Sequence, residues 1–149
     1  MTTTTTTTLH DKQLRIGFDA KRALFNSTGL GNYSRLVVEL MARRHPEWEI
    51  SLFSPRDSRK ALQRAATILG FDNVGVATPD SVVGRMLPSV WRSVAGLGRQ
   101  ASQSGINLFH GLSGELPGDI ARCGVPTVVT VHDLILNRCP DNYSAIDRR

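Results

Sequence analysis

Cysteine is scarce in this chain of 149 residues, which has two, Cys123 and Cys139. They do not form a C-x-x-C pair, and no histidine lies at the spacing from them that zinc sites use. We therefore expect two reduced, inert thiols, as in a cytosolic protein.

Long apolar runs are missing as well. No segment is long enough to span a membrane, and the N-terminus lacks the apolar core of a signal peptide. The chain begins with a low-complexity threonine tract, and we expect residues 1–13 to form a disordered tail. No run of lysine and arginine is interleaved with aromatic residues, as nucleic-acid binding would favour. These absences predict a cytoplasmic protein that does not bind nucleic acid.

The chain has an excess of positively charged residues. Its formal net charge is +5 and its sequence pI is about 9.9. Such a balance indicates either an anionic partner, such as a nucleotide or a phospholipid surface, or simply a basic, solvated surface.

One segment, residues 82–104, concentrates this charge on a helical pattern. Its apolar residues follow helical spacing, and arginines recur at every seventh position, at Arg85, Arg92 and Arg99. The pattern predicts one helix with a basic face. That helix either packs on the sheet as a crossover or rests on the anionic inner surface of the cell membrane.

Apolar runs alternate with helical patterns along the chain. The runs predict strands at 14–19, 48–54, 73–77, 106–109 and 126–131. The helical patterns predict helices at 30–44, 59–69 and 82–104, and a last one from about residue 143. This alternation is typical of an α/β protein with a doubly wound parallel sheet and helices on both faces.

Polar residues follow several of the predicted strands. Asp19 ends the first strand, His110 follows the fourth, and His132-Asp133 follows the fifth. Open α/β sheets bind ligands at the carboxyl ends of their strands, so we expect these residues to share one edge. A histidine beside a carboxylate there can bond a sugar hydroxyl or transfer a proton. The alternative is that the histidine forms a hydrogen bond with the backbone and has only a structural role at the end of the strand.

A glycine pair, Gly29 and Gly31, opens the predicted 30–44 helix. Glycine lets backbone N–H groups approach a ligand closely, and a helix N-terminus favours an anion. The segment before it, from Lys21 to Asn26, is expected to be a long loop, which often signals function.

Two common enzyme motifs do not fit. The dinucleotide fingerprint needs a third glycine or alanine where this chain has Ser34, and its glycines should directly follow the strand. No acidic residue closes the second predicted strand, which ends at Phe53-Ser54. The sequence Gly111-Leu112-Ser113-Gly114 has the wrong spacing for a nucleophile elbow, so a serine hydrolase is not expected.

Three blocks of sequence resemble family 4 glycosyltransferases. The first runs from Phe18 through Gly29-Leu30-Gly31-Asn32-Tyr33-Ser34-Arg35, and the second is Phe109-His110-Gly111 with Leu116-Pro117. The third is Gly124-Val125-Pro126 followed by Val129-Thr130-Val131-His132-Asp133-Leu134. The blocks occur in the family's order and cover nearly all of the chain after the threonine tract.

The resemblance implies the N-terminal, Rossmann-like domain of a GT-B enzyme that transfers a sugar from a nucleotide-sugar, with retention and without a metal or another cofactor. It implies catalytic roles for His132 and Asp133, with His132 contacting the transferring sugar. Asp133 and His110 would also line the acceptor side. The remaining expected substrate-binding residues are Gly29, Gly31, Asn32, Tyr33 and Asp19, of which the two glycines would lie near the donor diphosphate.

The chain also departs from this family. The second, donor-binding domain is absent, and so is its pair of glutamates eight positions apart; Glu39 and Glu47 share that separation by coincidence. We expect residues 14–149 to be a truncated acceptor-side domain, inactive alone, of an enzyme for a cell-surface polysaccharide or lipid-linked acceptor. The competing hypothesis is a non-catalytic, truncated α/β binding module.

Overall fold

A five-stranded parallel sheet forms the centre of the protein. The structure is a computed structural model that describes residues 13–133. The strands are β1 (Arg15–Asp19), β2 (Glu49–Phe53), β3 (Val74–Ala77), β4 (Leu108–Gly111) and β5 (Thr127–Val129). Their order in the sheet is β3-β2-β1-β4-β5, and every neighbouring pair is parallel. The predicted α/β class with a parallel, Rossmann-like sheet is confirmed.

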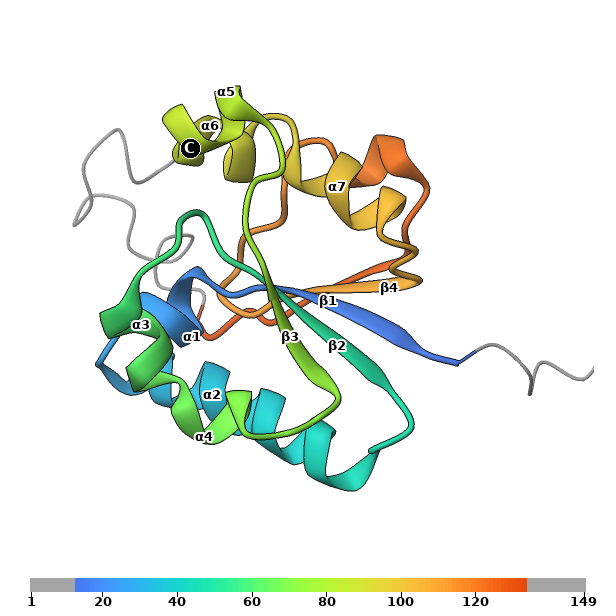
Figure 1. Ribbon diagram of the computed structural model, residues 1–149. Helices are drawn as coiled ribbons and strands as arrows, with labels where there is room; N and C mark the ends of the chain where they lie inside the picture. The colour runs from blue at the N-terminus through green and yellow to red at the C-terminus, as the bar shows by residue number, and fades with distance from the viewer. Residues whose placement is uncertain (1–12, 134–149) are drawn as a thin grey trace, which may run out of the picture.

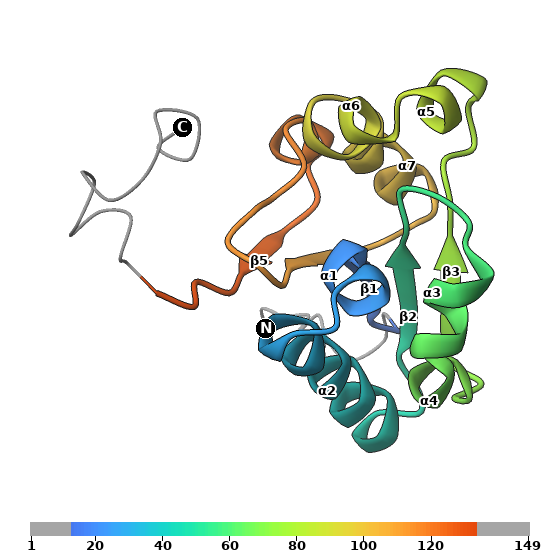
Figure 2. The same ribbon diagram turned by 90° about the vertical axis from the view of Figure 1, so that its left-hand side faces the viewer.

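Helices lie on the two sides of this sheet. Figure 1 shows α1 (Lys21–Phe25), α2 (Gly29–Arg44), α3 (Arg59–Arg64) and α4 (Ala66–Leu69) on one side. On the other side are α5 (Val82–Met86), α6 (Pro88–Ser93) and α7 (Leu97–Gln103). A 3₁₀ turn, η1 (Ile120–Cys123), precedes β5, which Figure 2 shows at the edge opposite β3.

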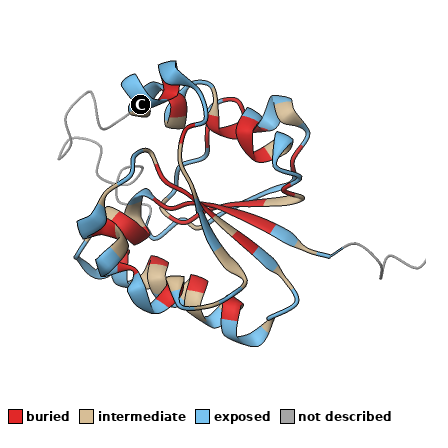
Figure 3. Cartoon of the chain, in the orientation of Figure 1, coloured by how far each residue is buried: buried red, intermediate tan, exposed pale blue. Residues whose placement is uncertain are grey.

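Alternate strand residues feed two separate cores, because successive side chains of a strand point to opposite faces. Ile16 and Phe18 of β1 join Val38 of α2 in one core. Phe109 of β4 joins Trp91 of α6 in the other. Figure 3 shows the buried residues along the strands and on the helix faces that turn toward them. Four of the five residues of β1 are buried, as expected for a strand of a parallel sheet whose two faces are both covered.

The predicted single helix over 82–104 is wrong. The segment forms α5, α6 and α7, because Pro88 starts a new helix and Gly96 has a backbone φ of +131°, outside the helical region. The three arginines therefore do not share a face. Arg92 points inward instead, and its side chain is only 11% exposed.

Other boundaries differ in smaller ways. Residues 21–25 form α1 rather than the predicted loop, and the predicted 59–69 helix is divided at Ala65 into α3 and α4. Within residues 13–133, no helix has both the length and the apolar character needed to cross a membrane. The predicted disordered tail, except for Gln13, and the helix from residue 143 lie outside the described residues.

Gly17 in β1 provides a test of this packing. A Cβ atom there would lie 2.9 Å from the Phe53 ring and 3.0 Å from the Phe109 ring. We expect Gly17→Ala to lower the free energy of unfolding by about 1–3 kcal/mol, because the core is already filled. Gly75→Ala in β3 is the matched control, since nothing lies within 4 Å of its Cβ position. Denaturant titration measures both, and equal midpoints for the two variants would contradict the packing argument.

Candidate functional site

The candidate site lies where the strand order reverses, at the carboxyl ends of β1 and β4. β1 pairs with β2 on one side and with β4 on the other, so the chain crosses over the sheet in opposite directions from this point. Open α/β sheets bind ligands in the crevice that this reversal leaves. Asp19 ends β1, and His110 lies in β4 one residue before its end.

Four polar residues from three parts of the chain meet at this edge, and we call them the histidine cluster: Tyr33, His110, Thr130 and His132. Thr130 Oγ1 lies 2.8 Å from His110 Nε2 and 3.4 Å from the Tyr33 hydroxyl. The ring of Tyr33 meets that of His132 edge-on, with centroids 4.8 Å apart. The cluster brings together three predicted site residues and adds Thr130.

His132 has a defined tautomer when it is neutral. Its Nε2 lies 2.8 Å from the carbonyl oxygen of Leu112, and a carbonyl can only accept a hydrogen bond. Nε2 therefore carries the proton, and Nδ1 is left as an acceptor. The residue is exposed, as is the neighbouring Asp133. A hydrogen bond to the backbone is what a purely structural role for His132 at the end of the strand would require. This bond engages only one of the two ring nitrogens, however.

His110 is buried beside Phe18, with ring centroids 5.5 Å apart. Burial lowers the pKa of His110 below the ordinary value of 6.5, because a low-dielectric environment disfavours the charged ring. His110 is therefore neutral near pH 7, with one ring nitrogen as a donor and the other as an acceptor.

Asp19 is engaged inside the protein. Its Oδ2 accepts a 2.6 Å hydrogen bond from Arg92 Nη1, and its Oδ1 accepts a 3.1 Å bond from the Lys21 amide. Arg92 Nη2 also lies 2.8 Å from a carboxylate oxygen of Glu115. Burial alone would lower the pKa of Arg92, but the two carboxylates raise it above its ordinary value. The sequence predicted a ligand-binding role for Asp19, whereas the structure gives both of its oxygens protein partners.

The two glycines of the loop differ in their surroundings. Gly29 is exposed, and nothing lies within 4 Å of its Cβ position. Gly31 is buried, and a Cβ atom there would overlap the carbonyl oxygen of Asn26. Gly31 therefore lets α2 pack against the preceding loop. Asn32 is exposed and its side-chain oxygen accepts a 2.6 Å bond from Arg35.

The first backbone N–H groups of α2 have no hydrogen-bond partner within the helix. Thr28 is its N-cap residue, but no side-chain hydrogen bond caps the helix. The hydroxyl of Thr28 donates instead to Asn26. The first N–H groups of a helix have no partner within it, and together with the helix dipole they favour an anion.

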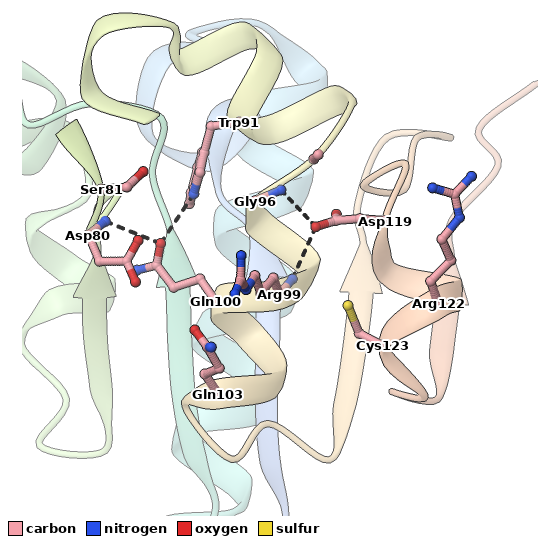
Figure 4. A pocket seen from close by; sticks show the side chains of 11 residues that line it. Asp80, Ser81, Trp91, Gly96, Arg99, Gln100, Gln103, Asp119, Arg122 and Cys123 are labelled. Atoms are coloured by element: carbon pink, nitrogen blue, oxygen red, sulfur yellow. Dashed lines mark hydrogen bonds between the residues drawn. The ribbon is translucent and has the colours of Figure 1, made fainter. Parts of the chain in front are cut away.

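A hollow of about 710 Å³ lies elsewhere, against α7 (Figure 4). Its buried polar groups already bond within the protein. Gln100 accepts from the Trp91 indole N–H at 3.2 Å and donates to the Thr78 carbonyl at 2.8 Å. Asp119 accepts from the amides of three residues at the start of α7, namely Gly96, Gly98 and Arg99. We assign these contacts to holding α7 in place.

Among residues 13–133, no three His, Cys, Asp or Glu side chains are grouped so that they could hold a metal ion. No protein-family model, no curated protein and no solved structure matches the chain.

Sequence reasoning missed Thr130 and Arg92. The sequence places Thr130 in the fifth predicted strand and in the third family-like block, and its hydroxyl two positions before His132 is the signal that could have identified it. For Arg92, the sequence predicts a place on the basic face of one helix, whereas the structure breaks that helix at Pro88 and Gly96.

The burial of His110 predicts a pH dependence. The folded protein binds fewer protons at this ring than the unfolded chain does, so stability should fall as the pH decreases from about 7 through 6.5. Urea unfolding at several pH values measures this. His110→Gln, which keeps a hydrogen-bonding group, should lose less stability over that range than the parent chain. An unchanged pH dependence in the variant would show that His110 is not responsible.

Proposed function

We propose that this chain is the acceptor-side domain of a retaining glycosyltransferase. Such an enzyme moves a sugar from a nucleotide-sugar to a cell-surface polysaccharide or a lipid-linked acceptor. The observation that carries the proposal is the histidine cluster at the reversal of strand order. It joins residues from all three sequence blocks that resemble the family.

The chemistry of the cluster suits a sugar. Tyr33 and Thr130 contribute hydroxyl groups, and the two histidines contribute nitrogens that can donate or accept. A sugar presents many hydroxyl groups with the same double capacity. The aromatic rings of Tyr33 and His132 add an apolar surface beside these polar atoms.

The roles proposed for the individual residues are those that the resemblance to family 4 glycosyltransferases implies. His132, held by the Leu112 carbonyl, would contact the transferring sugar, and Asp133 and His110 would line the acceptor side. The uncapped start of α2 at Gly29 would help to stabilise the negative charge on the leaving diphosphate. Asp19 would act indirectly, because its bond to Arg92 fixes the end of β1.

The proposal is tested by sugar transfer and by thermal shift with a panel of UDP-, GDP- and ADP-sugars. The assay uses both the chain alone and a protein that joins it to a donor domain. A ligand that binds the native state raises the unfolding midpoint. We expect the joined protein to respond to one nucleotide class and to transfer its sugar.

His132→Ala should lower kcat/KM of the joined protein about a hundredfold, because it removes a group that contacts the transferring sugar. His45→Ala is the matched control, since His45 lies at the far end of α2, stacked on Trp48. Equal losses of kcat/KM in the two variants would show that the histidine cluster takes no part in sugar transfer. Binding of a nucleotide-sugar without any transfer would favour the hypothesis of a non-catalytic binding module. If the joined protein is folded but binds no nucleotide-sugar, the proposal is wrong.

A further inference from the structure

The loop over residues 112–119, which joins β4 to η1, connects α6 with the histidine cluster. At its start, the carbonyl oxygen of Leu112 lies 2.8 Å from Nε2 of His132. Near its end, the Gly118 amide donates a 3.2 Å hydrogen bond to the carbonyl of Ser93, the last residue of α6. The loop therefore links a helix that lies outside the cluster to a ring that belongs to it.

Buried residues fix the two ends of this loop. Leu112 is buried in the core on the α2 side of the sheet. At the other end, Pro117 is buried, and a Cβ atom at Gly118 would lie 2.6 Å from the Ser93 carbonyl oxygen. Neither of these packing contacts involves the side chain of Glu115.

The middle of the loop lies at the surface, where Gly114, Glu115 and Leu116 are exposed. One contact that holds it is a 2.8 Å hydrogen bond from the Gly114 amide to the Thr130 carbonyl. Another is the ion pair of Glu115 with Arg92, whose Nη2 lies 2.8 Å from Oε2 of Glu115. The Glu115 side chain therefore ties the exposed middle of the loop to α6.

Arg92 gives this ion pair a fixed base. Its second terminal nitrogen, Nη1, donates a 2.6 Å hydrogen bond to Asp19, which is buried at the end of β1. A guanidinium group is planar and points its N–H donors in fixed directions. Because one side of the group is bonded to Asp19, the other side meets Glu115 in a defined place.

The direction of the Leu112 carbonyl depends on the middle of the loop. This carbonyl belongs to the planar peptide group that joins Leu112 to Ser113, so it turns with the backbone that follows it. The ring of His132 contacts the carbonyl and, edge-on, the ring of Tyr33. His132 is otherwise exposed. A displacement of the loop would therefore change the direction in which the His132 ring points.

We propose that Glu115 is a positioning residue for His132. Its ion pair with Arg92 fixes the loop so that the Leu112 carbonyl binds Nε2 of the ring, and Nδ1 is presented as an acceptor. Glu115 itself does not touch the sugar. The catalytic part of this inference rests on the proposed function, because it requires that His132 contacts the transferring sugar. The structural part holds for the chain alone.

The structural part is tested on the full chain through the ¹⁵N NMR signals of the His132 ring, above about pH 8, where an ordinary histidine is neutral. A ring whose Nε2 is bonded to a carbonyl keeps one tautomer, whereas an unbonded ring populates both. Glu115→Ala should therefore shift the two ring-nitrogen signals toward each other. Glu115→Gln, which can still accept a hydrogen bond from Arg92, should shift them less.

The matched control is Glu39→Ala, which removes the 2.8 Å ion pair between Glu39 and Arg43 on α2 and should leave the His132 signals unchanged. The side chain of Glu115 is 50% exposed, so Glu115→Ala should keep a urea midpoint close to that of the parent chain. Unchanged His132 signals in folded Glu115→Ala, or equal shifts in the two variants, would overturn the proposal.

The catalytic part is tested in the protein that joins this chain to a donor domain. Glu115→Ala should lower kcat about tenfold and change KM by less than about twofold, because it misdirects a ring and removes no contact with substrate. In a His132→Ala background the same change should have little effect, since Glu115 acts through that ring.

Equal losses of kcat in the two backgrounds would show that Glu115 does not act through His132. If the joined protein transfers no sugar at all, the proposed function fails and the catalytic part fails with it. The NMR measurement still decides the structural part, so the two failures are distinguishable.

Discussion

The bridge from Arg92 to Asp19 and Glu115 ties together the parts of the protein that form the carboxyl edge. Asp19 ends β1, Arg92 belongs to α6, and Glu115 lies in the loop after β4. The side chains of Arg92 and Asp19 are only 11% and 6% exposed. A buried charge that loses its partner is costly, so each of the three holds the others in position. The bridge is therefore a constraint on geometry more than a source of net stability.

Once this edge is fixed, close backbone contacts place the remaining site residues. Gly31 lets α2 approach Asn26, and α2 then presents Tyr33 toward Thr130. Gly111 has a comparable role, because a Cβ atom there would overlap the carbonyl oxygen of Glu115. The histidine cluster thus depends on glycines as much as on its own polar atoms. At Gly31 and Gly111 it is the small size of glycine that matters, whereas at Gly96 it is its conformational freedom.

Much of this arrangement could be predicted from local pattern. All five strands lie where alternating or β-branched runs placed them, within two residues at each end, and α2 begins one residue before its predicted start. The prediction that Asp19, His110 and His132 share one edge needed only the rule that parallel strands end together. The segment 82–104 could not be predicted in the same way. Its apolar spacing fits a helix, but the backbone at Gly96 and the inward turn of Arg92 depend on contacts with Trp91 and Asp19.

The sequence by itself determined the α/β class, the parallel sheet and the edge at which its polar residues gather. These properties depend on periodicity and on chain direction, which are local. Only the tertiary structure decided that Asp19 is held by Arg92 and that Thr130 bonds His110. It also decided that the apolar residues of α5 and α6 face outward. Such partnerships join residues up to 73 positions apart, and no local pattern carries information about which distant side chain will fill a given space.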